Sequence, residues 1–178
     1  MLYNNNQGFT LNLIKIFARQ LLNAMKFMKQ YHIIHCDMKP ENILLTHPNN
    51  TNIKVIDLGT GCYENKTVYT YIQSRFYRAP EIILGTQYTC AIDMWSLGCI
   101  LLELHLGAPI FAGEDESEQM AMIMEYRGIP SAKVILVNIL LRKEPGQEIS
   151  LILTSNRFVS LTLKVIKGYL KINTLKIY

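Results

Sequence analysis

The sequence lacks long hydrophobic runs and the features of an exported protein. No stretch of about 20 consecutive apolar residues occurs, so we expect no membrane span. The N-terminus, residues 1–7, has no basic segment followed by an apolar one, and we therefore expect no signal peptide. The cysteines form no Cys-x-x-Cys pair, which argues against a disulfide framework or a zinc site. We expect reduced thiols and a location in the cytoplasm and/or nucleus.

Acidic residues are scarce at one end of an otherwise ordinary globular composition. Of the 178 residues, 49% are apolar and 18% are charged, which argues against disorder. Residues 131–178 hold 8 Lys/Arg and 2 Asp/Glu, whereas residues 1–130 hold 10 and 12. This basic tail fits binding to nucleic acid or anionic lipid, or a different origin from the rest of the chain. It does not interleave basic and aromatic residues, so we expect no nucleic-acid partner.

Periodic patterns in the first third predict a helix and a hairpin. Thr10 is suited to cap a helix that runs to about Tyr31. Its apolar residues recur at spacings of three or four and share one face, which we expect to pack in the core: Ile14, Phe17, Leu21, Met25 and Met28. Two β-prone runs, 43–45 and 53–56, flank a turn-rich connector at 47–52 and predict a β-hairpin.

The middle of the chain alternates between a long loop and helices. Residues 60–78 are polar with five aromatics and no clean period, which is typical of a functional loop. A short helix is predicted to start at 79–81, a helix buried nearly all round at 93–106, and a helix with an acidic first turn at 114–127. From about residue 131 the patterns that predict helices, strands and turns become weak. The predicted fold class is mainly α with a short β-hairpin.

Four polar residues supply the groups that phosphoryl transfer requires. Asp37 is the candidate base, which orients the attacking hydroxyl and accepts its proton. Lys39 alternates to the same side as Asp37 and can reach a γ-phosphate. Asn42 follows at the spacing of a kinase signature, and Asp57 ends the second hairpin strand. Both offer the hard oxygen donors that Mg²⁺ prefers, so the expected cofactors are ATP and Mg²⁺.

Each of these residues has a simpler interpretation when taken alone. An Asp after a His is often a turn residue or a helix cap, Asp-x-Gly is a common turn, and an Asn before an apolar strand is unremarkable. The case rests on four blocks that occur in one order: His35-x-Asp37-x-Lys39-Pro40-x-Asn42, Asp57-x-Gly59, Ala79-Pro80-Glu81 and Asp93-x-Trp95-Ser96-x-Gly98.

These blocks resemble the eukaryotic protein kinase family, and more narrowly the dual-specificity tyrosine-phosphorylation-regulated kinases (DYRK family, CMGC group). The narrower resemblance rests on His35-Cys36-Asp37 and on residues 61–65, 68–81 and 92–100. It implies a protein-kinase-like C-terminal lobe, with residues 1–130 as a partial kinase domain. No G-x-G-x-x-G or V-A-I-K precedes residues 35–42, which match the family's catalytic loop, so we expect the N-terminal lobe to be missing. The tail, 131–178, is expected to be divergent and of unclear structure.

The resemblance also implies a regulatory tyrosine. Cys36 stands where most kinases have an Arg that pairs with a phosphate on the activation loop. Other cations must therefore pair with that phosphate here. Tyr71 matches the second Tyr of the family's Tyr-x-Tyr motif, which the kinase phosphorylates on itself. Arg75 and Arg78 are the natural partners of that phosphate. The alternative is that Tyr71 is a packing aromatic in a surface loop.

Three further residues are expected to be structural. The resemblance implies that Asp93 accepts backbone hydrogen bonds from the catalytic loop, in which His35 is also a structural residue. Glu81 is implied to pair with an Arg in a late helix, but the sequence offers no recognisable candidate. The resemblance further implies that Cys36 and Cys62 lie near each other.

Two functions remain open. The first is a protein kinase that transfers the γ-phosphate of ATP to Ser/Thr of protein substrates and phosphorylates its own Tyr71, with a preference for Pro after the Ser or Thr implied by the family. The alternative is a catalytically inactive, truncated C-terminal lobe that acts as a binding module, or a gene fragment. Without a covering lobe, we expect association through the exposed cleft surface.

Overall fold

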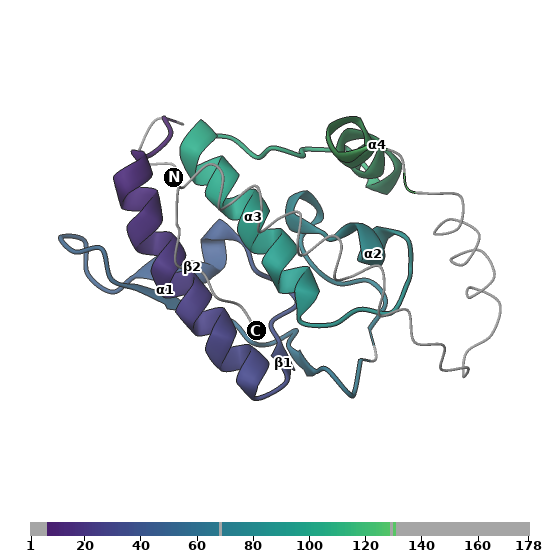
Figure 1. The fold of residues 1–178 in the computed structure, drawn as a ribbon, viewed down its shortest axis with the longest axis horizontal. Coiled ribbons are helices and arrows are strands. Elements are labelled where there is room, and N and C mark those ends of the chain that lie inside the picture. The colour runs from purple at the N-terminus through teal and green to yellow at the C-terminus, as the bar shows by residue number, and fades with distance from the viewer. Residues whose placement is uncertain (1–6, 68, 129, 131–178) are drawn as a thin grey trace.

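The computed structural model describes residues 7–67, 69–128 and 130, and the predicted basic tail lies outside them (Figure 1). Helices dominate, with two small antiparallel sheets. The elements in chain order are α1 (Leu11–Gln30), β1 (Ile33–Ile34), the 3-10 helix η2 (Pro40–Asn42), β2 (Ile43–Leu45), β3 (Ile53–Val55), β4 (Cys62–Tyr63), the 3-10 helix η3 (Arg75–Tyr77), α2 (Pro80–Ile83), α3 (Ala91–Leu106) and α4 (Glu116–Arg127).

Helix α1 follows its predicted pattern. The hydroxyl of Thr10 accepts a hydrogen bond from the amide of Leu13 at 3.5 Å, which satisfies one of the free amides of the first turn. The predicted apolar face is buried at Ile14, Leu21, Met25 and Met28, while Phe17 is half-buried. The helix therefore presents one apolar stripe to the interior, as its spacing predicts.

Helix α3 is the central element against which α1 packs (Figure 1). It begins two residues before the predicted start at Asp93, and nearly all of its first three turns are buried. Gly107 ends it with a φ of 86°, a left-handed conformation that glycine adopts without steric cost. Among the described residues, no helix has the length and apolar character needed to cross a membrane.

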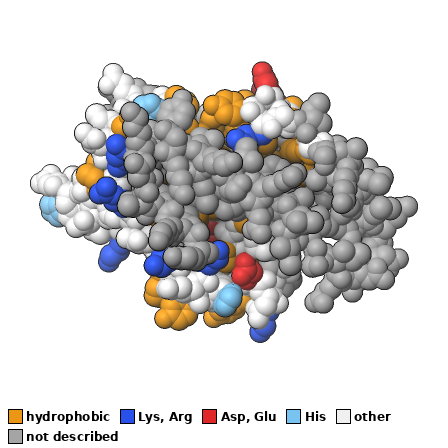
Figure 2. Space-filling model, viewed as in Figure 1, with side chains coloured by type: hydrophobic (Ala, Val, Ile, Leu, Met, Phe, Trp, Pro, Cys, Tyr) orange, Lys and Arg blue, Asp and Glu red, His pale blue; other side chains and the backbone are white. Residues whose placement is uncertain are grey.

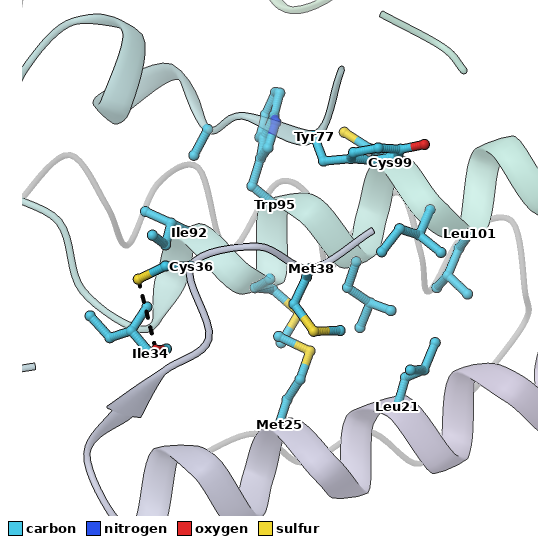
Figure 3. Close-up of a cluster of buried hydrophobic side chains, with 14 of the residues drawn as sticks. Leu21, Met25, Ile34, Cys36, Met38, Tyr77, Ile92, Trp95, Cys99 and Leu101 are labelled. Carbon is cyan, nitrogen blue, oxygen red and sulfur yellow. Dashed lines mark hydrogen bonds between the residues drawn. The ribbon is translucent and has the colours of Figure 1, made fainter. Parts of the chain in front are cut away.

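The chain between β1 and η2 passes between α1 and α3. Figure 3 shows Cys36 and Met38 reaching into the core, where Met38 lies between Met25 of α1 and the side chains of α3. Both residues are buried. Cys36 adopts a left-handed φ of 65°, so the chain bends there, and Asp37 and Lys39 are only partly buried and bond to each other. The core thus sets which side chains of this loop face outward.

The two sheets hold the loops around this segment. The predicted hairpin is confirmed as β2 paired with β3, with Ile43 opposite Val55 and Leu45 opposite Ile53. The loop predicted over 60–78 is interrupted by β4, which pairs antiparallel with β1, and by η3. A pair of two-residue strands has too few residues to show a period, so the sequence pattern did not reveal it. Helices α2 and α4 pack together at the far end from α1 (Figure 1).

Candidate active site

The catalytic loop, residues 35–42, is anchored by a buried carboxylate. The backbone amides of His35 and Cys36 donate to Asp93 at the start of α3, at 2.7 and 3.1 Å, so the hydrogen bonds predicted for Asp93 are present. His35 is buried; its Nδ1 accepts from the amide of Asp37 at 3.2 Å, which leaves Nε2 to donate to the Ile56 carbonyl at 3.0 Å. These bonds connect the loop to α3 and to the residue that directly follows the hairpin strand β3.

Asp37 lies at the centre of a polar network. One carboxylate oxygen accepts from Lys39 Nζ at 2.7 Å and from Asn42 Nδ2 at 3.3 Å. The other accepts from the hydroxyl and the amide of Ser74, at 2.8 and 3.2 Å. Asn42 also donates to the Asp37 carbonyl at 2.8 Å. The structure therefore brings together Asp37, Lys39 and Asn42 as predicted, and adds Ser74.

The network fixes the charges of its members. Burial of the Asp37 side chain favours the neutral acid, but hydrogen bonds from Lys39 and Ser74 outweigh that effect and lower the pKa of Asp37. The hydrogen bond to Asp37 raises the pKa of Lys39, against a smaller effect of burial. Asp37 is thus a carboxylate and Lys39 an ammonium at neutral pH, as a hydroxyl-orienting base beside a phosphate-binding cation requires.

Asn42 and Asp57 are the candidate metal ligands. The Ile56 amide donates to the Asn42 carbonyl at 2.9 Å, which holds the backbone before Asp57 beside η2. Asp57 is exposed, adopts a φ of 65°, and accepts from the Gly59 amide at 3.2 Å. No cluster of three or more His, Cys, Asp or Glu able to hold a metal ion occurs within 7–67, 69–128 and 130. The two oxygen donors fit Mg²⁺, which usually keeps several waters and takes its remaining ligands from phosphates.

Two neighbours, Gln73 and Ser74, are the site residues that sequence reasoning missed. Gln73 has a φ of 65° and a buried side chain that donates to the Ile92 carbonyl and Ser96 hydroxyl and accepts from the Ala79 amide. Its amide donates to the Cys36 carbonyl at 2.9 Å, which ties the activation segment, residues 69–81, to the catalytic loop. No local pattern marks either residue; both lie inside the block 68–81 that carries the family resemblance, but the sequence alone assigned them no role.

The predicted tyrosine and its two arginines are only partly assembled. Tyr71 is 70% exposed, and the guanidinium carbon of Arg78 lies 4.3 Å from the centre of its ring. Arg78 is buried and donates to the carbonyls of Ile72 and Gln73 and to Glu116 of α4. Arg75 instead donates to the Gly113 and Glu114 carbonyls, so it is turned toward the segment before α4.

Glu81 is a buried carboxylate with an incomplete environment. It is 7% exposed, and its Oε2 has no hydrogen-bond partner among the described residues. Burial raises its pKa to about 7. The arginine that the family resemblance implies for it is not found in the described part of the chain.

Cys36 and Cys62 lie close together as predicted, with 3.7 Å between their free thiol sulfurs.

Comparisons with known proteins place this chain in a family. Residues 1–168 match the protein kinase domain. The chain is 54% identical over 74% of its length to the probable serine/threonine-protein kinase dyrk2 of Dictyostelium discoideum. It is 54% identical over 74% of its length to the dual specificity tyrosine-phosphorylation-regulated kinase 4 of Homo sapiens, and 52% identical over the same share to the DYRK-family kinase pom1 of Schizosaccharomyces pombe.

The chain spans only part of each relative, covering 14%, 25% and 12% of their respective lengths. The family match begins at residue 1 and extends to 168, so it does not confirm the prediction that the N-terminal lobe is missing. That prediction, like the one for a divergent tail at 131–178, stays a prediction. The DYRK resemblance read from residues 61–65, 68–81 and 92–100 is confirmed.

Proposed function

The chain belongs to the protein kinase family, and from this premise we propose that it carries the phosphoryl-transfer site of a DYRK-type kinase. The reaction would move the γ-phosphate of ATP to Ser or Thr of protein substrates and to Tyr71 of the chain itself. The observation that supports this most is the Asp37 network, in which a carboxylate, an ammonium and an amide converge from one loop. Phosphoryl transfer depends mainly on such positioning and charge.

Each residue has a defined task in this proposal. Asp37, ionised because of Lys39 and Ser74, accepts the hydrogen bond of the incoming hydroxyl and takes its proton as the oxygen–phosphorus bond forms. Lys39 contacts the γ-phosphate and offsets the charge that develops there. Asn42 uses its amide nitrogen on Asp37, so its amide oxygen is left for Mg²⁺, together with Asp57. Bound Mg²⁺ neutralises the nucleotide phosphates.

The Gln73 carbonyl supports a preference for Pro after the phosphorylated residue. Ser74 is bonded to Asp37, so a substrate whose hydroxyl meets Asp37 continues past Gln73. The Gln73 carbonyl accepts from Nε and Nη2 of Arg78, at 3.2 and 2.8 Å, and is therefore engaged within the protein. A substrate amide at this position would lose water without gaining that acceptor, whereas Pro has no amide hydrogen to satisfy.

Autophosphorylation of Tyr71 is supported by its exposure and by Arg78. A phosphate on Tyr71 would carry nearly two negative charges at neutral pH and would lie close to a guanidinium that already contacts the ring. Arg78 would then be shared between the phosphate and Glu116. We propose that this competition adjusts the position of α4 relative to the activation segment.

The non-catalytic alternative is not favoured, because a pure binding module has no need for a charged network around Asp37. A role in association is compatible with either function. Four apolar side chains are exposed beside the candidate metal ligands: Leu44, Leu45, Ile56 and Leu58. They support the proposal that this cleft surface contacts protein.

We also propose a reducing location, the cytoplasm and/or nucleus, since the four cysteines are free thiols.

The test is phosphate transfer by the chain with Mg²⁺ and labelled ATP, using a Ser-Pro peptide and the same peptide with Ala in place of Pro. We expect transfer to the Ser-Pro peptide and to the chain itself, and loss of both on Mg²⁺ chelation or in Asp37→Asn. Equal transfer to both peptides would refute the proline preference alone. No transfer and no binding of Mg²⁺-ATP would refute catalysis by this chain.

A further inference from the structure

The outward face of α1 carries positive charge that nothing in the described structure neutralises. Lys15, Arg19, Lys26 and Lys29 lie on this helix, which contains no acidic residue. Three ion pairs occur among the described residues, formed by His32, Lys39 and Arg78, so none of the four cations of α1 takes part. Figure 2 shows Lys and Arg side chains in the part of the view that α1 occupies in Figure 1.

Only part of this charge stabilises the helix itself. Lys29 lies in the last turn, where the helix dipole favours a cation, but Lys15 and Arg19 are like charges at i and i+4, which repel each other. At about 100° per residue, the four cations fall along one edge of the exposed face. Mixed charges would stabilise a solvated helix better, so a purely structural explanation accounts poorly for the pattern.

The opposite edge of the same face is apolar. Ile16 is 40% exposed and Phe27 59%, and Phe27 packs on Tyr31, itself 58% exposed, with 4.8 Å between ring centres. Asn12, Asn23 and Gln30 separate this edge from the cations by helical position. The face therefore pairs a row of positive charge with a row of exposed apolar side chains, over about 21 Å between Lys15 and Lys29 at the α-helical rise.

This chain offers no acidic segment that could cover the face. Residues 1–6 hold no charged side chain and 131–178 hold two acidic residues against eight basic ones. The acid-rich stretch at 114–118 is engaged at the start of α4: Asp115 caps the helix, Glu116 pairs with Arg78, and Glu118 accepts from the Glu114 amide. Within this sequence no acidic segment is free to cover the face, which favours another molecule as the source of the complementary charge.

We propose that the exposed face of α1 docks an acidic amphipathic helix of a partner protein. Such a helix, with carboxylates along one edge and Leu-like residues along the next, would match both rows at once. Nucleic acid would bind the cations but would not provide an aliphatic side chain to pack against Ile16. A flat lipid surface fits poorly, because the hairpin connector stands beside this helix, tied to it by Gln20, whose side chain bonds the Thr51 carbonyl and the Ile53 amide at 2.8 and 3.0 Å.

The proposal can be tested by fluorescence anisotropy with the full chain and a labelled peptide of about 14 residues, which as a helix spans about 21 Å and so matches the length of this face, and which repeats Glu-Leu-Ala-Glu-Leu-Ala-Gln. Arg19→Glu/Lys26→Glu should weaken binding at least about tenfold, because two attractive contacts become repulsive. The matched control, Lys54→Glu/Lys66→Glu, makes the same change in net charge off α1 and should change the Kd less than about twofold. Thermal unfolding of both variants verifies that they fold.

Further probes identify the occupant. A peptide with Gln in place of Glu should bind at least about tenfold more weakly, and Ile16→Ser/Phe27→Ser should weaken the acidic peptide without changing the binding of oligothymidylate. The proposal is overturned if both charge-reversal variants weaken the peptide equally, or if the Gln peptide binds as well as the Glu peptide. It is also overturned if oligothymidylate or vesicles containing phosphatidylserine bind more tightly than the peptide through Arg19 and Lys26.

Discussion

The catalytic loop and the activation segment face each other but hold their polar groups differently. In the loop, Cys36 and Met38 are buried in the core while Asp37 and Lys39 bond to each other. In the activation segment, Tyr71 is exposed, and Arg75 Nε and Glu81 Oε2 have no hydrogen-bond partner among the described residues. In the catalytic loop, the polar groups find their partners within the fold. In the activation segment, some charged groups lack partners among the described residues. The geometry proposed for catalysis is therefore built into the fold, whereas the geometry proposed for regulation is open to change.

The contrast between the catalytic loop and the activation segment predicts that the largest loss of activity follows a substitution of Asp37. Asp37→Asn removes the carboxylate but keeps the shape, so transfer should fall about a thousandfold while the free energy of unfolding changes by less than about 1 kcal/mol. Initial rates and urea unfolding of the same preparation measure both. Glu125→Gln, an exposed charge loss on α4, is the matched control and should change neither. Retention of activity within tenfold would show that Asp37 is not the base.

A second effect should appear in the pH dependence of stability. The pKa of Glu81 is raised to about 7 in the folded chain, above its ordinary 4.5. The folded state therefore binds the proton more tightly, and this contribution is fully present below about pH 4.5 and is lost as the pH rises through about 7, with an upper size of roughly 3 kcal/mol. Urea unfolding measures it. Glu81→Gln should flatten the profile over this range; an unchanged profile would contradict the buried, unpaired carboxylate.

Asp93 tests whether the catalytic loop depends on its anchor. Asp93→Asn leaves one amide of the loop facing an NH₂ group instead of an oxygen, and should lower the free energy of unfolding by about 2 kcal/mol. Amide exchange at His35 and Cys36 should quicken more than exchange in the middle of α1. If exchange rises equally everywhere, Asp93 stabilises the fold as a whole and does not specifically anchor the loop.

The smallest effect is expected at Tyr71, in the region open to change. Tyr71→Phe blocks phosphorylation but keeps the ring that Arg78 contacts and leaves the Asp37 network intact, so activity should fall only severalfold. Tyr69→Phe, also exposed and two residues away, should leave activity unchanged. Limited proteolysis of the activation segment provides a second measurement. If Tyr71→Phe, Tyr69→Phe and the phosphorylated chain are equally protected from proteolysis, phosphorylation of Tyr71 does not order the activation segment.

Sequence reasoning succeeded where the signal was local. The span of α1 and its cap at Thr10 follow from spacing and residue type, and the hairpin follows from two β-prone runs around a turn. It failed where partners lie far apart in the chain. Ser74 reaches Asp37 across 37 positions, and Arg75 is drawn to Gly113 across 38, so neither contact leaves a periodic trace.

The alternation of the catalytic loop has a consequence for how this segment tolerates change during evolution. Because Cys36 and Met38 are buried in the core while Asp37 and Lys39 bond to each other, inserting or deleting one residue between His35 and Lys39 would displace residues of both kinds. A shift that moved Asp37 or Lys39 toward the apolar interior would bury a charge without a partner. Point substitutions can be absorbed one side chain at a time, but a shift in length cannot. Among functional relatives, the number of residues in this loop should vary less than their identity.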